Sequence, residues 1–213
     1  MRGHFDVTLL DSGGYSDEQF KRAIEEKRID QLLAVLKVEQ KLSRRNLIMD
    51  NVAGMVFQYS FSGPAIVADY GSYGDNWLNN ISLLTKDEDP TYTEDNQWYG
   101  GAENGGDNIG ASGSTKRFVV DTVDPHQLAV LSGGREGIYF RSRWLFLPAQ
   151  GVSNNIRSIG ICWCRYASNL TTSIDRGRIG RVRLKDDQGR NVILNKTSRQ
   201  VLLVEYELTL FTI

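Results

Sequence analysis

The alternation of apolar and polar residues is clearest near the end of the chain. Apolar side chains occupy every second position there: Leu202, Val204, Tyr206, Leu208 and Leu210. Glu205 and Glu207 fall on the opposite face, which is the period of a strand with one buried side. The preceding run has a similar alternation. We therefore predict that Arg183 or Lys185 lies beside these two acids on a neighbouring strand.

Shorter runs of the same kind recur along the chain and predict further strands. They cover residues 4–10, 46–61, 77–84, 117–123, 138–147 and 156–166, and two more flank the turn 186–189. Ile159, Ile161 and Trp163 are expected to share one core with Phe140, Trp144 and Phe146. Many short apolar runs between glycine-rich turns favour a mainly β chain. We predict one antiparallel β-sandwich domain over 1–213, similar to a jelly roll.

One segment near the start has helical signals instead. Ser16 precedes Gln19 by three residues, which is the spacing of a capping box, and acidic residues follow in the first turn. No glycine or proline occurs between Tyr15 and Ala53. We therefore predict one long helix from Asp17 to about Lys41, within a helical insertion over about 16–45.

That helix would carry apolar residues on two sides. Phe20, Ile24, Val35 and Val38 fall on one side of a helical projection, and Ile29, Leu32, Leu33 and Leu36 fall on roughly the opposite side. A helix lying on its own sheet needs only one apolar side. We expect the second side to contact another copy of the chain or a different protein. Coverage by the domain's own loops is the alternative.

Residues 71–113 form an irregular stretch that is rich in glycine, asparagine and aspartate. Four aromatic residues of this stretch, Trp77, Tyr92, Trp98 and Tyr99, are candidates for a protein interface. Aromatic faces in a loop also suit a sugar-binding platform. The acids Asp87, Glu88, Asp89, Glu94, Asp95, Glu103 and Asp107 permit a calcium site, although the EF-hand spacing is absent. A solvated loop is the simpler interpretation of these acids.

The amino-acid composition excludes some classes of binding partner for this protein. The 213 residues include 25 basic and 26 acidic residues, so no net field attracts nucleic acid or an anionic membrane. No secretory signal is expected after Met1. Cys162 and Cys164 lie two residues apart on a predicted strand, where small buried side chains are expected rather than a disulfide. These features favour synthesis in a reducing cytoplasm.

The sequence contains none of the common catalytic motifs that we searched for. It contains no G-x-S-x-G, no Walker loop and no paired histidine motif, and His4 and His126 are its two histidines. We expect no enzymatic activity, no cofactor and no bound metal.

Three segments, in the same relative order, resemble a class of tailed-bacteriophage virion proteins. They are G-H-F-D-V-T-L-L-D-S-G-G at 3–14, N-L-I-M-D-N-V-A-G-M-V at 46–56, and I-R-S-I-G-I at 156–161 together with R-V-R-L-K-D-D-Q-G at 181–189 and L-L-V-E-Y-E-L-T-L at 202–210. The resemblance covers about a third of the chain. The predicted helix and the triplet Cys162–Cys164 have no counterpart in it.

The resemblance implies a non-enzymatic β-sandwich that assembles into a tail, collar, adaptor or baseplate. Its expected partners are further copies of itself in a symmetric assembly and neighbouring virion proteins. Its expected location is the virion, after synthesis in the cytoplasm of the bacterial host. A carbohydrate-binding β-sandwich that serves host attachment is the alternative function.

Overall fold

A computed structural model describes residues 2–48, 80–90, 115–116, 121–123, 128–131, 135–166 and 173–211. The chain is mainly β, with antiparallel strands and few helices. Its strands are β1 (Arg2–Asp11), β2 (Val38–Ile48), β3 (Asn80–Leu84), β4 (Thr115–Lys116), β5 (Asp121–Val123), β6 (Leu128–Leu131), β7 (Arg135–Phe146), β8 (Ser153–Ile156), β9 (Ser158–Tyr166), β10 (Ser173–Arg183), β11 (Leu194–Lys196) and β12 (Gln200–Phe211).

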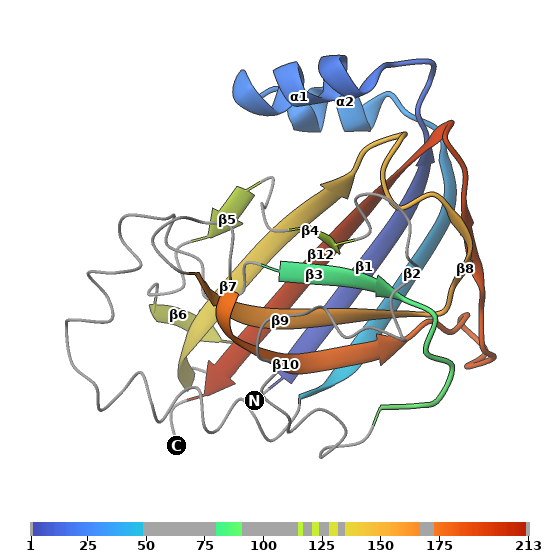
Figure 1. The fold of residues 1–213 in the computed structure, drawn as a ribbon. Coiled ribbons are helices and arrows are strands. Elements are labelled where there is room, and N and C mark those ends of the chain that lie inside the picture. Colours follow the sequence, from blue (N-terminus) through green and yellow to red (C-terminus); the bar gives the residue numbers. More distant parts are fainter. Residues whose placement is uncertain are drawn as a thin grey trace.

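Ten of these strands form one sheet, in the order β4-β3-β9-β10-β2-β1-β12-β7-β5, with β6 also paired to β7. In Figure 1, β3, β9 and β10 run across the front of β7, β12, β1 and β2, so the sheet folds over on itself. The turn of the sheet lies between β10 and β2, where only Gly180 and Arg181 pair with Ile48 and Leu47. Strands β8 and β11 form a separate pair.

The main apolar core lies between the two crossing groups of strands. Alternation along each strand sends one set of side chains inward, as strand geometry requires. The buried members of this core are Phe5, Val7, Leu9, Leu42, Ile81, Leu83, Trp144, Phe146, Ile156, Ile159, Val182, Leu184, Leu194, Leu202, Val204 and Tyr206. The predicted inward face of the last strand is thus confirmed at Leu202, Val204 and Tyr206. Ile159, Trp144 and Phe146 also share this core as predicted, whereas the side chains of Ile161, Trp163 and Phe140 lie outside the described part.

The single long helix predicted from Asp17 to about Lys41 is wrong. The chain forms two short helices, α1 (Asp17–Glu25) and α2 (Ile29–Ala34). The start of α1 is as predicted, because the Ser16 hydroxyl accepts from the Gln19 N–H and the Gln19 side chain accepts from the Ser16 N–H. The end of the predicted helix is a strand, since β2 begins at Val38.

The break between the helices has a local cause. Lys27 has a φ of 54°, and its N–H donates to the Ile24 carbonyl at 3.0 Å. The Arg28 N–H donates to the Ala23 carbonyl at 2.8 Å. A residue in the left-handed region followed by such a bond ends a helix. Glycine usually occupies that position, and a lysine there gives no signal in the sequence.

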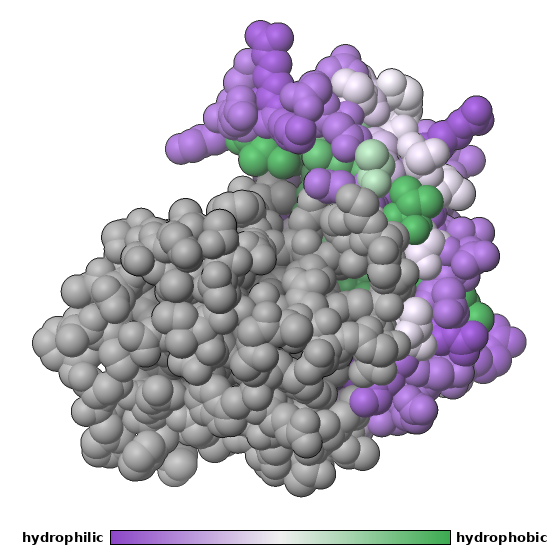
Figure 2. All heavy atoms as spheres, viewed as in Figure 1, coloured by the Kyte–Doolittle hydropathy of each residue, from purple (hydrophilic) through white to green (hydrophobic). Residues whose placement is uncertain are grey.

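The two helices cover the outer face of β1, β12 and β7 at one end of these strands (Figure 1). Their apolar side chains form a second core with the sheet, made of Leu10, Phe20, Ala23, Ile29, Leu36, Leu145, Leu147, Val201 and Leu203. Figure 2 shows hydrophobic atoms on the side of the helices that faces the sheet and hydrophilic atoms on the outward side. Folding the chain back at Lys27 therefore brings Phe20 and Ile24 from one predicted apolar side, and Ile29 and Leu36 from the other, onto one sheet. Val35 and Val38 are exposed instead.

Of the irregular stretch 71–113, the structure describes residues 80–90, and β3 overlaps the strand expected at 77–84. The aromatic residues Trp77, Tyr92, Trp98 and Tyr99 lie outside the described residues. Within the described ranges, no helix is both long and apolar enough to cross a membrane.

Candidate functional site

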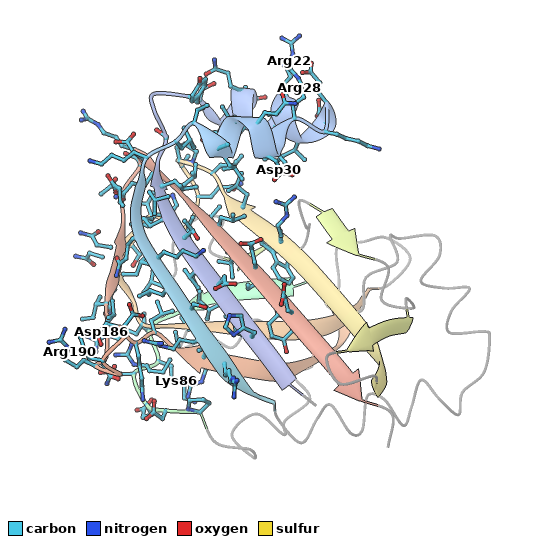
Figure 3. All side chains as sticks on the ribbon, turned by 180° about the vertical axis from the view of Figure 1, so that it is seen from behind. Arg22, Arg28, Asp30, Lys86, Asp186 and Arg190 are labelled. Carbon is cyan, nitrogen blue, oxygen red and sulfur yellow. The ribbon has the colours of Figure 1, made fainter. Side chains whose placement is uncertain are left out.

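A row of polar side chains crosses the outer face of β2, β1, β12 and β7. The strand register places Ser43, Asp6, Glu205 and Arg143 directly opposite one another, one from each strand. The face they share is visible from behind in Figure 3. The predicted basic neighbour of Glu205, Arg183 or Lys185, is thus wrong. The last strand pairs with β1 and β7, so its basic neighbour comes from β7.

One end of this row brings together serine, histidine and aspartate, the residue types of a hydrolase triad. The His4 Nε2 atom lies 2.9 Å from the Ser43 Oγ atom and 3.4 Å from the Asp6 Oδ1 atom. In a working triad the two partners occupy different ring nitrogens, because the carboxylate must hold one while the other accepts the serine proton. Here both partners share Nε2. The arrangement therefore lacks the geometry of a nucleophile and its base.

The other end of the row anchors the helices to the sheet. Asp30 of α2 points toward β7 in Figure 3, while Arg22 and Arg28 point away from the sheet. The Arg143 guanidinium donates to the Asp30 carboxylate through two nitrogens, at 2.5 Å and 3.3 Å. This bidentate pair fixes the angle of α2 more than it stabilises the fold, because the carboxylate is largely exposed.

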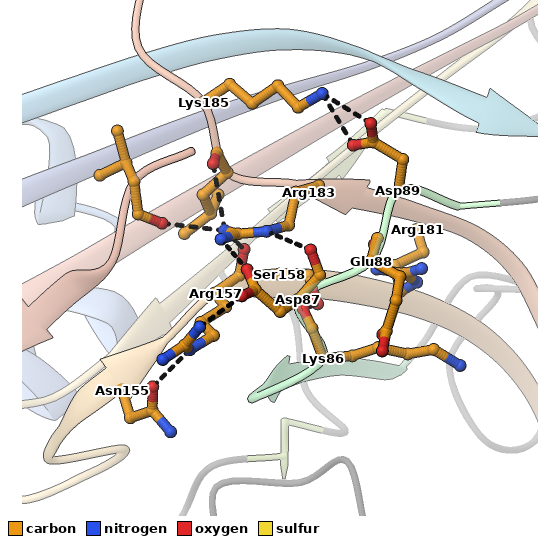
Figure 4. Close-up of polar contacts among 12 residues, drawn as sticks. Lys86, Asp87, Glu88, Asp89, Asn155, Arg157, Ser158, Arg181, Arg183 and Lys185 are labelled. Carbon is orange, nitrogen blue, oxygen red and sulfur yellow. Dashed lines mark hydrogen bonds and ion pairs between the residues drawn. The ribbon is translucent and has the colours of Figure 1, made fainter. Parts of the chain in front are cut away.

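A denser charged cluster holds the segment that follows β3. We call it the arginine clamp; it consists of Arg157, Arg181 and Arg183 around residues 85–89 (Figure 4). The Asp87 carboxylate accepts from both Arg183 and Arg157, the latter at 2.5 Å. The Asp87 carbonyl also accepts from the Arg183 Nε atom at 2.8 Å. The clamp thus ties the segment after β3 to the end of β10, at Arg183, and to Arg157, which directly precedes β9.

Arg183 is the centre of the clamp and has an exposed fraction of only 3%. Its Nη1 atom donates to the carbonyls of Arg157, Leu184 and Val192, at 2.5 Å, 3.2 Å and 2.9 Å. Burying a guanidinium is costly unless its donors are satisfied, and these carbonyls satisfy them. Arg183 is therefore committed to the fold and has little capacity left for a ligand.

The neighbouring basic residues are engaged in the same way. The Arg181 Nη1 atom donates to the Glu88 carbonyl at 2.8 Å, and Lys185 pairs with the Asp89 carboxylate at 2.7 Å. Basic residues at the alternate positions 181, 183 and 185 are typical of a solvated strand face, but Arg181 and Arg183 are buried. What covers that face is the segment 85–89.

The charges of the clamp change the acidity of Asp87. Desolvation at this position opposes ionisation and raises the pKa. The Arg183 and Arg157 charges, together with their hydrogen bonds, act in the opposite direction and prevail, so the pKa of Asp87 lies below its ordinary value of 3.8. The carboxylate therefore stays ionised to a lower pH than an ordinary aspartate does.

The same contacts bear on the calcium alternative. Asp87 and Asp89 direct their carboxylates to arginine and lysine, which compete with a cation for the same oxygens. Of the remaining acids of that alternative, Glu88 is exposed. The others, Glu94, Asp95, Glu103 and Asp107, lie outside the described residues. Among the described residues, no group of three or more histidine, cysteine, aspartate or glutamate side chains is placed to hold a metal ion.

Lys196 is a further buried cation that sequence reasoning did not single out. Its exposed fraction is 1%, and its Nζ atom donates to the carbonyls of Leu147 and Pro148 at 2.9 Å and 3.1 Å. These carbonyls follow the end of β7, where the ladder stops. The lysine therefore closes the end of one strand from a neighbouring pair of strands, which is a structural role.

The predicted interface residues of the helical segment divide into two groups. Ile29 and Leu36 are buried in the second core of their own chain, so they face the sheet rather than a partner. Leu32 and Leu33 pack against the same core but stay partly exposed. The only predicted interface residues with accessible surface in the described part of the chain are thus Leu32 and Leu33.

Comparison with protein-family models, with curated proteins and with solved structures found no match to this chain.

Proposed function

We propose that this chain is a structural subunit of a tailed-phage virion that acts by assembling with other proteins. The observation that carries the proposal is where the three resembling segments lie. Their described residues fall on β9, β10, β2, β1 and β12, which are consecutive neighbours in the sheet; of the segment 46–56 these are residues 46–48, at the end of β2. Segments scattered over 200 residues thus belong to one contiguous structural unit. That is what a shared architecture requires and what chance similarity would rarely produce.

The proposal includes a finer description of the fold. The crossing of β3, β9 and β10 over the other strands, with an apolar core between the two groups, supports a β-sandwich of the jelly-roll type. The helical connection 12–37 is then an addition to the end of such a sandwich, since it joins two adjacent strands, β1 and β2.

Assembly is the proposed mechanism, with no chemical step. Copies associate in a closed symmetric ring or cluster and then contact neighbouring virion proteins, either in the tail, the collar, an adaptor or the baseplate. Leu32 and Leu33 contribute from α2, beside the exposed Val35, whose exposed fraction is 71%. This places one contact on the helical end of the molecule.

The experiment is to measure the mass of the purified chain by light scattering and native mass spectrometry over a wide range of concentration. We expect a defined oligomer. Replacing Leu32 and Leu33 with glutamate should lower the mass, whereas Ala34→Glu on the exposed side of the same helix is the matched control. Thermal unfolding of each variant separates loss of assembly from loss of folding.

A monomer at every concentration contradicts self-association. An oligomer that survives both glutamate substitutions in a folded chain contradicts the contact on α2. Specific binding of the monomer to a glycan array would instead favour the carbohydrate-binding alternative.

A further inference from the structure

Among the described residues, one edge of strand β2 is mostly unpaired; we call it the open edge. The first edge of β2 pairs with β1 from Val38 to Asn46. On the second edge only Leu47 and Ile48 pair, with β10. Within the described ranges no strand runs alongside residues 38–46 on that second edge.

The described chain that follows β10 does not continue the pairing along this edge. Strand β10 runs up to β2 and ends at Arg183. The next residue, Leu184, donates its N–H to the Arg157 carbonyl at 2.9 Å. Lys185 then lies at the inner side of β2, where its carbonyl accepts from the Arg44 side chain instead of pairing with the main chain of residues 38–46. The turn Asp186–Gly189 and β11 follow. An open edge of this length presents main-chain N–H and C=O groups to any extended segment that approaches.

The side chains on this edge are mainly basic. Lys41 and Arg45 are exposed on the outer face, where the register places them opposite Thr8 and His4. Arg44 points to the inner face, and its Nε atom donates to the Lys185 carbonyl at 3.1 Å.

One nitrogen of Arg44 has no acceptor. The Nη2 atom is buried and makes no hydrogen bond to the described residues. The nearest acidic oxygen, on Asp187, lies 3.9 Å away on a side chain whose exposed fraction is 94%. A buried guanidinium nitrogen without an acceptor is unfavourable, so Arg44 adds an uncompensated positive charge behind the basic outer face of this edge.

We propose that the open edge of β2 binds an extended acidic segment of another protein as an added strand. Acidic residues at alternate positions of that segment would face Lys41 and Arg45, and the main chain would supply the hydrogen bonds. This inference rests on the proposed assembly function in one respect: the acidic segment would come from a neighbouring subunit of that assembly.

A second copy of this chain fits the edge less well. Lys41, Arg44 and Arg45 would bring basic residues against basic residues if two such edges paired. Glu39, the one acid on β2, accepts from the Gln200 side chain and is already engaged. Basic residues on an edge disfavour pairing between identical edges and leave an acidic strand as the suitable occupant.

The test uses a fluorescein-labelled peptide of alternating glutamate and valine, and a matched peptide with lysine in place of glutamate. Fluorescence anisotropy with the full chain should show binding of the first and none of the second. Hydrogen–deuterium exchange should show slower exchange of amides within residues 38–46 when the glutamate peptide is bound. Binding through side-chain charge alone would not protect those amides.

A charge-reversed variant of β2 tests whether the basic side chains contribute to binding. Lys41→Glu with Arg45→Glu should weaken binding of the glutamate peptide by about tenfold or more, because two attractive cross-strand pairs become repulsive. The matched control is Lys21→Glu with Arg22→Glu on α1, which should leave the affinity unchanged. Circular dichroism verifies that both variants fold.

Three outcomes would overturn the inference. Unprotected amides in 38–46, or equal affinity in the charge-reversed variant, would show that β2 does not receive a strand. Self-association that the same reversal abolishes would make the occupant a second copy. The proposed virion role can fail separately. If the chain binds the peptide but never assembles, the open-edge site is supported and the virion role is contradicted.

Discussion

Two connections of this molecule are docked onto the sheet by opposite means. The helical connection 12–37 lies on the outer face through apolar side chains, with Phe20 fully buried at its centre. The segment 85–89 has no apolar residue in that contact and is held by the arginine clamp, centred on Arg183. The first arrangement depends on burial of area, and the second on hydrogen-bond geometry and charge.

The difference has a practical meaning for each connection. Apolar docking tolerates changes of pH and salt, and its strength follows the volume of the buried side chains. A clamp of charged groups holds one geometry closely but depends on every donor finding its acceptor. We therefore expect the helices to respond to changes in size, and the clamp to respond to changes in hydrogen bonding and protonation.

The largest effect is expected from Phe20→Ala. Removing this buried ring should lower the free energy of unfolding by about 3–5 kcal/mol, because it leaves a cavity between α1 and the sheet. Urea denaturation followed by fluorescence measures the change. Val35→Ala, at an exposed position near the same helices, should stay within about 0.5 kcal/mol. Equal losses in the two variants would contradict apolar docking of α1.

A smaller loss is expected from Arg183→Met. The methionine fills part of the volume but leaves the carbonyls of residues 87, 157, 184 and 192 without their donor, which should cost about 1–3 kcal/mol. The same denaturation measurement applies, with Arg199→Met as an exposed control. If Arg183→Met is as stable as the parent, the clamp contributes nothing and the segment 85–89 is held by other contacts.

The cap of α1 should contribute less again. Ser16→Ala removes the acceptor for the Gln19 N–H and should cost about 1 kcal/mol. Ser16→Asp keeps an acceptor at the same position and should restore most of that loss. Thermal unfolding of the three proteins is sufficient to compare them, and an aspartate variant no better than the alanine variant would argue against the capping role.

The smallest effect is expected from Asp87 and depends on pH. Its pKa is lowered in the folded chain, so its contribution is complete above its ordinary pKa near 3.8 and is lost as the pH falls through the lowered value. Asp87→Asn should therefore be less stable than the parent near neutral pH, and the two should converge in strong acid. Paired denaturation curves over that range decide the point; a constant difference would exclude the ionised carboxylate as the cause.

Local patterns in the sequence predicted local features well. The alternation in β12 and the cap at Ser16 rest on neighbouring residues, and both are present. The helix boundary was missed because Lys27 reverses the chain without glycine or proline. The helical projection of apolar residues assumes one straight helix axis, so it failed beyond the break at Lys27. It placed Val35 and Val38 on a buried side with Phe20, whereas both are exposed.

The contacts of the candidate site could not be read from local patterns. Arg183 and Asp87 are 96 residues apart in the chain, and their pairing depends on how the sheet folds over. The same holds for Arg143 beside Glu205, where the sequence suggested a neighbour on the preceding run. The sequence showed which residues share a strand face but not which strand lies opposite.

The pairing of β1 with β12 has a consequence for synthesis on the ribosome. Phe5 lies opposite Tyr206, so β1 needs a strand that is made much later. After β2 emerges, roughly 150 residues remain before β12 is complete, which takes about 8–30 s at ordinary translation rates. During that interval β1 can pair with β2 but has nothing on its other edge. That edge of β1 is therefore exposed to unwanted pairing until β12 is available.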